Sequence, residues 1–223
     1  MIRLILYPKI KTLVFCISLS ERGTQSQHSN SYEDFLPLLE QSSITWADIK
    51  VDNIPKEIIE IADKFGFSHG LGKQLFAGST DGRHFQGGYE DLDTEMGLLF
   101  PVIRTEDFNI TIKPLMIFLK RGLVLTVRNR DIHIFHNLHR YAKTFFKKLP
   151  KNLQPIDWLS LILIRIIDEN NKRNFEQLQE IDESSGDLTR NFKSDTPFRT
   201  DFGEKIIEMK HALITYLSGL WKL

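Results

Sequence analysis

Three strand-like segments in close succession, followed by a long apolar helix, most constrain the fold of this chain. Residues 96–104, 110–119 and 123–127 are rich in aliphatic and β-branched side chains, which is typical of strands. Only residues 120–122, which include a glycine, separate the second segment from the third, and this predicts a short hairpin. An apolar helical pattern then covers residues 155–181. Strands followed by helices of this length predict an α/β fold.

The first half of the chain alternates between short strand and helix patterns. Strands are predicted at residues 2–6, 12–19 and 44–51, and helices at residues 32–41, 54–65, 68–76 and, after the hairpin, 134–146. The polar residues 20–31 predict a loop. Asp52 or Asn53 can cap helix 54–65, Pro55 fits its first turn, and Gly66 fits its end.

Size and charge exclude several classes of protein. The 223 residues suit one α/β domain or two small ones, and 29 basic against 29 acidic side chains argue against nucleic acid as the main partner. The single Cys16 cannot form an internal disulfide, which favours a reducing compartment. The longest apolar runs, 12–20 and 212–221, reach about half of the ~20 residues that a membrane-spanning helix needs. At the N-terminus, Lys9 and Lys11 interrupt what would be the apolar core of a signal peptide. Taken alone, these features predict a soluble cytosolic protein.

The C-terminal segment carries apolar residues at alternating spacings of four and three, the pattern of a helix that packs lengthwise on another helix. These residues are Phe202, Ile206, Met209, Leu213, Tyr216 and Leu220. Residues 155–223 are therefore predicted to form a long helical hairpin, and residues 1–150 the sheet with its helices. The pattern is still running at the last residue, which suggests a chain cut short of its natural end.

Two glycine-containing motifs suggest chemistry but lack part of their required context. Residues 66–70 match the Gly-x-Ser-x-Gly nucleophile elbow, which would make Ser68 the nucleophile of an α/β-hydrolase. The elbow requires a buried strand before the serine, whereas residues 54–65 have a helical pattern. Residues 70–73 lack the first glycine of a phosphate loop, and Gln74 replaces its magnesium-binding hydroxyl residue. A serine hydrolase is therefore retained only as an alternative to a protein without catalytic activity.

Two groups of residues could bind metal ions. His133, His136 and His139 recur every three residues, and two of them could share a zinc ion, but no cysteine or flanking glutamate completes the set. Carboxylates between residues 168 and 187 could attract divalent cations, although a solvated helix face explains such a stretch more often. The candidate metal ligands within this stretch are Asp168 and Asp182.

Five segments, spread over nearly the whole chain, carry a resemblance to a known family. Residues 46–48 read Trp-Ala-Asp, residues 65–71 read Phe-Gly-Phe-Ser-His-Gly-Leu, and residues 117–127 read Ile-Phe-Leu-Lys-Arg-Gly-Leu-Val-Leu-Thr-Val. These three segments resemble motifs in the cytoplasmic N-terminal domain of the CorA family of magnesium and cobalt transporters. The first two are similar to the family's Trp-Val-Asp and Phe-Gly-Leu-His-Pro-Leu. The third, which is the most specific, is similar to the family's hairpin Leu-Phe-Leu-Gly-Lys-Asn-Phe-Leu-Val-Thr-Val. Residues 157–183 are similar to the family's long helix, and residues 204–220 to the helix that leads to its membrane stalk.

The resemblance implies an α/β/α sandwich around a central mixed sheet, followed by long helices that lead toward a stalk missing from this chain. It implies that the full protein is a homopentamer at the cell membrane that carries Mg²⁺ or Co²⁺, with residues 1–223 as a single regulatory domain on the cytoplasmic face. This domain would do no covalent chemistry. Its partners would be copies of itself and its own stalk and membrane domain, without nucleic acid or a small-molecule substrate. A Zn²⁺-exporting relative like the ZntB branch is the alternative.

The magnesium-sensing positions of the family are replaced in this sequence. Lys73 and Gln74 stand where the family has an acidic pair after its His-Pro-Leu segment. Arg165 stands where the long helix has a sensing aspartate, with Asp168 about one turn later. A cationic side chain repels a divalent ion at close range. The resemblance, with these departures, predicts weak or no Mg²⁺ binding by this domain.

Overall fold

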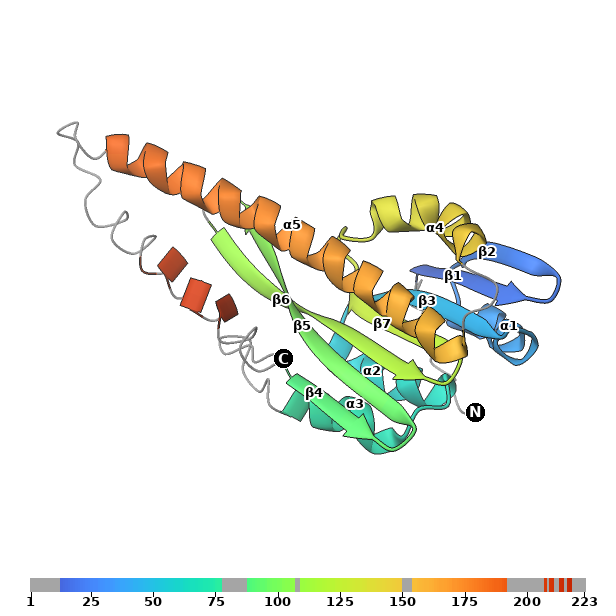
Figure 1. Cartoon of the computed structure of the whole chain (residues 1–223). Coiled ribbons are helices and arrows are strands. Elements are labelled where there is room, and N and C mark those ends of the chain that lie inside the picture. Colours follow the sequence, from blue (N-terminus) through green and yellow to red (C-terminus); the bar gives the residue numbers. More distant parts are fainter. Residues whose placement is uncertain are drawn as a thin grey trace, which may run out of the picture.

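The computed structural model describes residues 13–77, 88–106, 109–149 and 154–191, together with residues 207, 209, 210, 213, 214, 216 and 217 near the C-terminus. The strand predicted at residues 2–6 lies outside these residues. Within them, the chain forms a sheet with helices on both faces, and the long helix α5 (Pro155–Asn191) extends beyond the sheet (Figure 1).

Seven strands form one mixed sheet in the order β2-β1-β3-β7-β6-β5-β4. They are β1 (Leu13–Ser20), β2 (Gly23–Ser29), β3 (Ile44–Val51), β4 (Gly88–Leu92), β5 (Glu95–Glu106), β6 (Asn109–Lys120) and β7 (Leu123–Asn129). Among the described strands, β3 and β7 pair in parallel and all other neighbours pair antiparallel. The sheet therefore consists of two antiparallel halves joined along the β3–β7 ladder. The strands predicted at residues 12–19, 44–51, 96–104, 110–119 and 123–127 are confirmed.

Helices cover both faces of the sheet. The 3₁₀ helix η1 (Tyr32–Phe35) and the helices α1 (Leu36–Gln41), α2 (Ile54–Lys64) and α3 (His69–Ala77) lie on one face, and α4 (His136–Lys148) and α5 lie on the other. On the first face, Ile58 of α2 belongs to the same core as Ile49 of β3. On the second, Ile162 of α5 shares a core with Trp46 of β3. This arrangement confirms the predicted α/β/α sandwich.

Two polar edge strands were missed by the sequence patterns. Residues 20–31, predicted to be a loop, contain β2, which pairs with β1 after a turn in which Gly23 has a φ of +105°. At the opposite edge, β4 pairs with β5. Neither edge strand contains a buried residue, so neither shows the apolar alternation that marks a half-buried strand. The loop prediction for residues 20–31 is therefore wrong.

Local signals set the ends of α2 as predicted. The side chain of Asn53 caps the helix by accepting the N–H of Lys56 at 3.2 Å, and Glu57 accepts the N–H of Asn53 at 2.9 Å. Pro55 lies in the first turn, where its missing N–H has no partner to lose. Gly66 follows the last turn with a φ of +73°, a conformation that favours glycine.

Amide side chains of α5 cover part of the outer edge of β5, beyond the stretch that pairs with β4. The backbone N–H of Ile103 donates to Asn174 Oδ1 at 2.9 Å, and that of Thr105 donates to Gln177 Oε1 at 2.8 Å. Asn174 Nδ2 in turn donates to the carbonyl of Pro101 at 2.9 Å. Because buried backbone groups need partners, α5 supplies the hydrogen bonds that another strand would have made.

Part of the predicted C-terminal seam packs on α5 and β5. Met209 and Tyr216 are buried in one cluster with Ile103 of β5 and Ile181 of α5, and Leu213 packs against this cluster. The remaining members of the predicted seam lie outside the described residues. In the part of the chain that the structure describes, no helix combines the length and hydropathy of a membrane span.

Candidate functional site

The candidate metal ligands Asp168 and Asp182 lie on an exposed face of α5. At 3.6 residues per turn, Ile164, Asp168, Phe175 and Asp182 fall within about 40° of one another around the helix axis, and we call these four residues the outer face. Ile164 and Phe175 are each 61% exposed. The opposite side of α5 packs on the sheet, so the outer face presents apolar and acidic groups together to the surroundings.

Asp168 already has a cationic partner within its own helix. Arg165 Nη1 donates to Asp168 Oδ2 at 2.9 Å. The arginine that stands at the predicted sensing position thus neutralises the neighbouring carboxylate. Among the described residues, no group of three or more His, Cys, Asp and Glu side chains is placed to hold a metal ion.

The two other residues at predicted sensor positions lie in a different layer. Lys73 and Gln74 are exposed on α3, whose apolar side packs on the opposite face of the sheet from α5. The sheet therefore separates them from Arg165 of the same chain (Figure 1). Any site that combines these positions would need two copies of the chain.

Ser68 does not lie in a nucleophile elbow. The helix α2, which ends at Lys64, stands where the elbow requires a strand. The backbone N–H of Ser68 donates to Glu95 Oε2 at 2.8 Å, and this bond anchors the turn between α2 and α3 to the sheet. The neighbouring His69 Nδ1 lies 2.9 Å from Asp63 Oδ2 on the surface. The α/β-hydrolase alternative is therefore wrong.

The three spaced histidines have separate environments. His133 is exposed before α4, and His136 is the first residue of that helix. His139 stacks on the ring of Phe15 with 4.0 Å between centroids, and its Nε2 lies 3.0 Å from Asp48 Oδ2. His139 thus belongs to a packed polar cluster at the sheet.

A buried ion pair between Asp48 of β3 and Arg128 of β7 forms the centre of this cluster. Arg128 Nε and Nη2 donate to the two oxygens of Asp48 at 3.0 and 2.6 Å. Thr126 Oγ1 donates to Asp48 Oδ1 at 2.8 Å, and Trp46 Nε1 donates to Thr126 Oγ1 at 3.2 Å. Burial alone would raise the pKa of Asp48, but the charge of Arg128 and the contact with His139 hold it well below its usual range.

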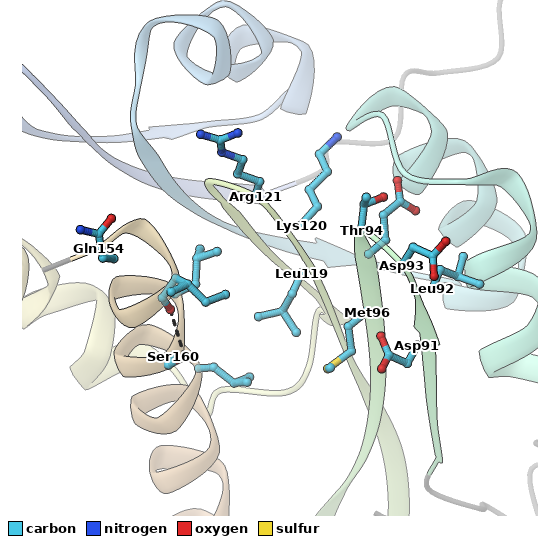
Figure 2. Close-up of a pocket in the computed structure, with 14 residues that line it drawn as sticks. Asp91, Leu92, Asp93, Thr94, Met96, Leu119, Lys120, Arg121, Gln154 and Ser160 are labelled. Carbon is cyan, nitrogen blue, oxygen red and sulfur yellow. Dashed lines mark hydrogen bonds between the residues drawn. The ribbon is translucent and has the colours of Figure 1, made fainter.

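A pocket of about 620 Å³ opens between the β4–β5 turn, the β6–β7 turn and the first turns of α5 (Figure 2). Its apolar lining consists of Leu92, Met96, Leu119, Ile156, Leu159 and Leu163. Asp91 and Asp93 come from the β4 side, and Arg121 comes from the β6–β7 turn. The pocket was not predicted, because its residues come from three separate segments and one of them is the polar strand β4.

Three of the polar side chains around this pocket make structural hydrogen bonds. Ser160 Oγ donates to the carbonyl of Ile156 at 3.0 Å, as the dashed line in Figure 2 shows. Lys120 Nζ donates to the carbonyl of Phe65 at 2.6 Å, and Glu95 accepts from Ser68. Covalent catalysis requires a nucleophile within reach of a base, and no such pair is formed among the residues that line this pocket. The lining is suited to receiving an apolar group.

Comparisons with known proteins place this arrangement in a family. The family model described as "CorA-like Mg2+ transporter protein" matches residues 41–223. The complete CorA magnesium transporter from Methanocaldococcus jannaschii has a TM-score of 0.65 and 17% identity, over 94% of this chain and 60% of that chain. Its soluble domain has a TM-score of 0.61 and 18% identity, over 100% and 77% of the two chains. The ZntB cytoplasmic domain from Vibrio parahaemolyticus RIMD 2210633 has a TM-score of 0.57 and 14% identity, over 92% and 75%.

The family match decides the assignment. No curated protein sequence matches the chain at a significant level, and the likeness to solved structures, at these identities, shows the fold alone. The chain spans 60% of the length of the complete M. jannaschii transporter. Because the family model covers residues 41–223, which is most of its length, this chain belongs to the CorA-like Mg²⁺ transporter family.

Proposed function

We propose that this chain is the cytosolic part of a transporter of divalent cations, and that it regulates the transporter and holds its subunits together without catalysing a reaction. The family match over residues 41–223 carries this proposal. The fold supports it, because an α/β/α domain of this kind occurs in the complete CorA magnesium transporter of M. jannaschii. In the pocket at α5, Glu95, Lys120 and Ser160 already have hydrogen-bond partners. This supports a role of the pocket in binding.

A second copy of this chain is the partner that we assign to the outer face of α5. Ile164 and Phe175 are large apolar side chains left exposed to water, an arrangement that burial against another protein would stabilise. Eleven residues separate them, which corresponds to about 16 Å along the helix. The pair therefore offers two anchor points on one straight surface. The resemblance to the CorA family supports a homopentamer as the assembled state.

The charges around these two side chains favour a contact between like chains. Arg165 is paired with Asp168 at 2.9 Å, and Arg173 is paired with Glu176 at 3.0 Å. Both pairs lie within α5, so most of the charge beside Ile164 and Phe175 is already neutralised. A surface of this kind can approach a neighbouring copy of the chain without strong repulsion, in contrast to a surface of uniform sign.

Mg²⁺ and Co²⁺ are the cargo ions that the family assignment favours for the full transporter, with Zn²⁺ as the second candidate. The likeness to the ZntB cytoplasmic domain supports the second candidate. Asp168 and Asp182 are the carboxylates that we assign to any metal contact between copies. Because Arg165 neutralises Asp168, we expect this contact to bind Mg²⁺ weakly. A metal can shift the equilibrium between two states of the assembly only if it binds one state more tightly than the other.

Self-association of the 223-residue chain tests the subunit-holding role. We expect sedimentation velocity to show a concentration-dependent increase in mass for the native chain. The double variant Ile164→Ser/Phe175→Ser should raise the dissociation constant at least about tenfold, equivalent to about 1.4 kcal/mol. Tyr141→Ser removes an aromatic side chain of similar exposure from α4 and should leave the dissociation constant unchanged. A native chain that stays monomeric at every concentration would contradict this part of the proposal.

Transport by the intact protein tests the remaining part. The complete transporter, purified and placed in liposomes, should carry at least one of Mg²⁺, Co²⁺ and Zn²⁺, measured with an enclosed metal-sensitive dye. The double variant on the outer face should change the dependence of uptake on internal metal, because it loosens the contacts that hold the subunits. Absence of uptake for all three ions would exclude the proposed transporter.

A further inference from the structure

A second, smaller pocket lies on the other half of the sheet, between β1, β2, β3 and the start of α4. Its volume is about 300 Å³. The lining residues are Phe15, His28, Asp48, Lys50, His136, His139 and Arg140. Five of these side chains carry a basic group, and they come from β2, β3 and α4. The fold thus gathers cationic groups from three separate elements around one cavity.

The one carboxylate in the lining is already neutralised. Asp48 is wholly buried and accepts hydrogen bonds from Arg128 and Thr126, with His139 Nε2 at 3.0 Å. Its charge is therefore balanced by Arg128 beneath the pocket. Lys50 and Arg140 remain as full positive charges, and the three imidazoles His28, His136 and His139 remain as groups that can donate hydrogen bonds or take up a proton.

Lys50 is a partly buried cation without an ion pair in the described part of the chain. Among the described residues, no carboxylate lies within ion-pair distance of its Nζ. Burial lowers the pKa of Lys50 and the nearby Arg128 lowers it further, while the charge of Asp48 opposes this shift only in part. Burial also lowers the pKa of His28, with further contributions from His139 and Lys50. These basic groups repel one another, and a bound anion would relieve the repulsion.

The start of α4 adds to the positive potential of the pocket. The helix has 13 residues and begins at His136, one of the lining residues. Its N-cap residue Phe135 makes no side-chain capping bond, and the first turn contains no acidic residue. Backbone N–H groups at the start of a helix favour an anion. They act here together with Lys50, Arg140 and the imidazoles.

We propose that this pocket binds a phosphate-bearing dianion, with Lys50 and Arg140 as the charged contacts and His28, His136 and His139 as hydrogen-bond donors. A cavity of about 300 Å³ suits inorganic phosphate or a small phosphomonoester better than a nucleotide. The proposal does not depend on the proposed transport function. The pocket lies beside α4 and shares no residue with the outer face of α5.

Titration of the full chain with inorganic phosphate, followed by calorimetry and by the imidazole NMR signals, tests the proposal. We expect saturable binding with a dissociation constant of about 1 mM or tighter at constant ionic strength. Lys50→Gln and Arg140→Gln should each weaken binding about tenfold, because each removes a charge-assisted contact. Lys147→Gln is the matched control. It removes the same charge from an exposed position about 10 Å further along α4.

A titration with sulfate distinguishes binding of a dianion in the pocket from general attraction of anions to positive charge. The charge of sulfate does not change between pH 6 and pH 8, so tighter binding at pH 6 would come from protonation of the pocket itself. The pKa of His28, which burial lowers in the free chain, should rise on binding when measured by NMR. Absence of saturable binding of phosphate and sulfate, or equal weakening by Lys147→Gln and Lys50→Gln, would overturn the proposal.

The source of the phosphate group is distinguished by two further ligands. Glycerol 3-phosphate in solution should compete with inorganic phosphate if the natural ligand is a small metabolite. Phosphatidylcholine vesicles containing phosphatidic acid should bind the chain, in a manner that depends on Lys50 and Arg140, if the ligand is a lipid headgroup. Either result supports a phosphate site at this pocket and identifies which source the pocket can reach.

Discussion

Asn174 of α5 accepts the backbone N–H of Ile103 in β5 at 2.9 Å, and so takes the place of a neighbouring strand. Asn174→Leu would leave this buried N–H without its partner, and the carbonyl of Pro101 would keep only the longer hydrogen bond from Asn170 Nδ2 at 3.5 Å. We expect the free energy of unfolding to fall by about 1–3 kcal/mol, measured by urea denaturation. Asn171→Leu alters an exposed amide of the same helix and should have little effect. Equal effects of the two substitutions would contradict the assigned role.

Removal of Arg128 should destabilise the fold strongly. Arg128→Met leaves the carboxylate of Asp48 buried without its cation, and we expect a loss of about 3–5 kcal/mol in the free energy of unfolding. The double variant Asp48→Leu/Arg128→Met removes both charges and should be more stable than Arg128→Met alone. If the double variant were the less stable of the two, the buried carboxylate would not be the source of the loss.

Acid should weaken the fold through Asp48. Its pKa is held below the ordinary range in the folded chain, so its ionised form contributes stability at pH values above the unfolded pKa of about 3.9. This contribution is lost as the pH falls below that value toward the folded pKa. Asp48→Asn should therefore be less stable than the native chain at pH 7 and show a shallower loss of stability below about pH 5, as followed by chemical denaturation at each pH.

Gly97 of β5 should not tolerate a larger side chain. A Cβ atom at this position would lie 3.1 Å from Leu75 Cγ and 3.3 Å from Leu71 Cδ1 of α3. We expect Gly97→Ala to cost about 1–3 kcal/mol through overpacking, whereas Gly88→Ala, with nothing within 4 Å of its new Cβ, should be nearly neutral. In a Leu75→Ala background the cost of Gly97→Ala should shrink, and a double-mutant cycle measures this coupling.

Magnesium should bind weakly to the chain. Arg165 neutralises Asp168, and Lys73 places a positive charge at the other predicted sensor position, in a different layer. Calorimetric titration with MgCl₂ should therefore reveal no sub-millimolar site. Arg165→Ala frees the Asp168 carboxylate and should increase the affinity for Mg²⁺. A tight site in the native chain would show that metal sensing uses other residues.

The strands and helices that were predicted correctly carry buried apolar side chains. Residues 115–118 of β6 and residues 123–127 of β7 are buried, and the two strands pair with each other. The missed strands β2 and β4 are polar edges, and their strand character comes from pairing with β1 and β5. Local sequence patterns carry no information about that pairing.

The candidate sites could be predicted only in part for a related reason. Asp168 and Asp182 were recognised from the acidic stretch, but their grouping with exposed Ile164 and Phe175 depends on which side of α5 faces the sheet. Lys50 and His28 come together with His139 only through the order of β1, β2 and β3 and the position of α4. Contacts between residues distant in the sequence need the fold itself.

The parallel β3–β7 ladder has a consequence for how fast this chain can fold. Hairpins such as β1–β2 and β6–β7 join neighbours in sequence, whereas Asp48 and Arg128 are separated by 80 residues. Closing a loop of that size costs entropy before any contact compensates for it, and pairing of distant strands slows folding. We therefore expect the meeting of β3 with β7 to limit the folding rate. A slip of one residue between β3 and β7 would place the two charges on opposite faces of the sheet, so their pairing also selects the correct register at that step.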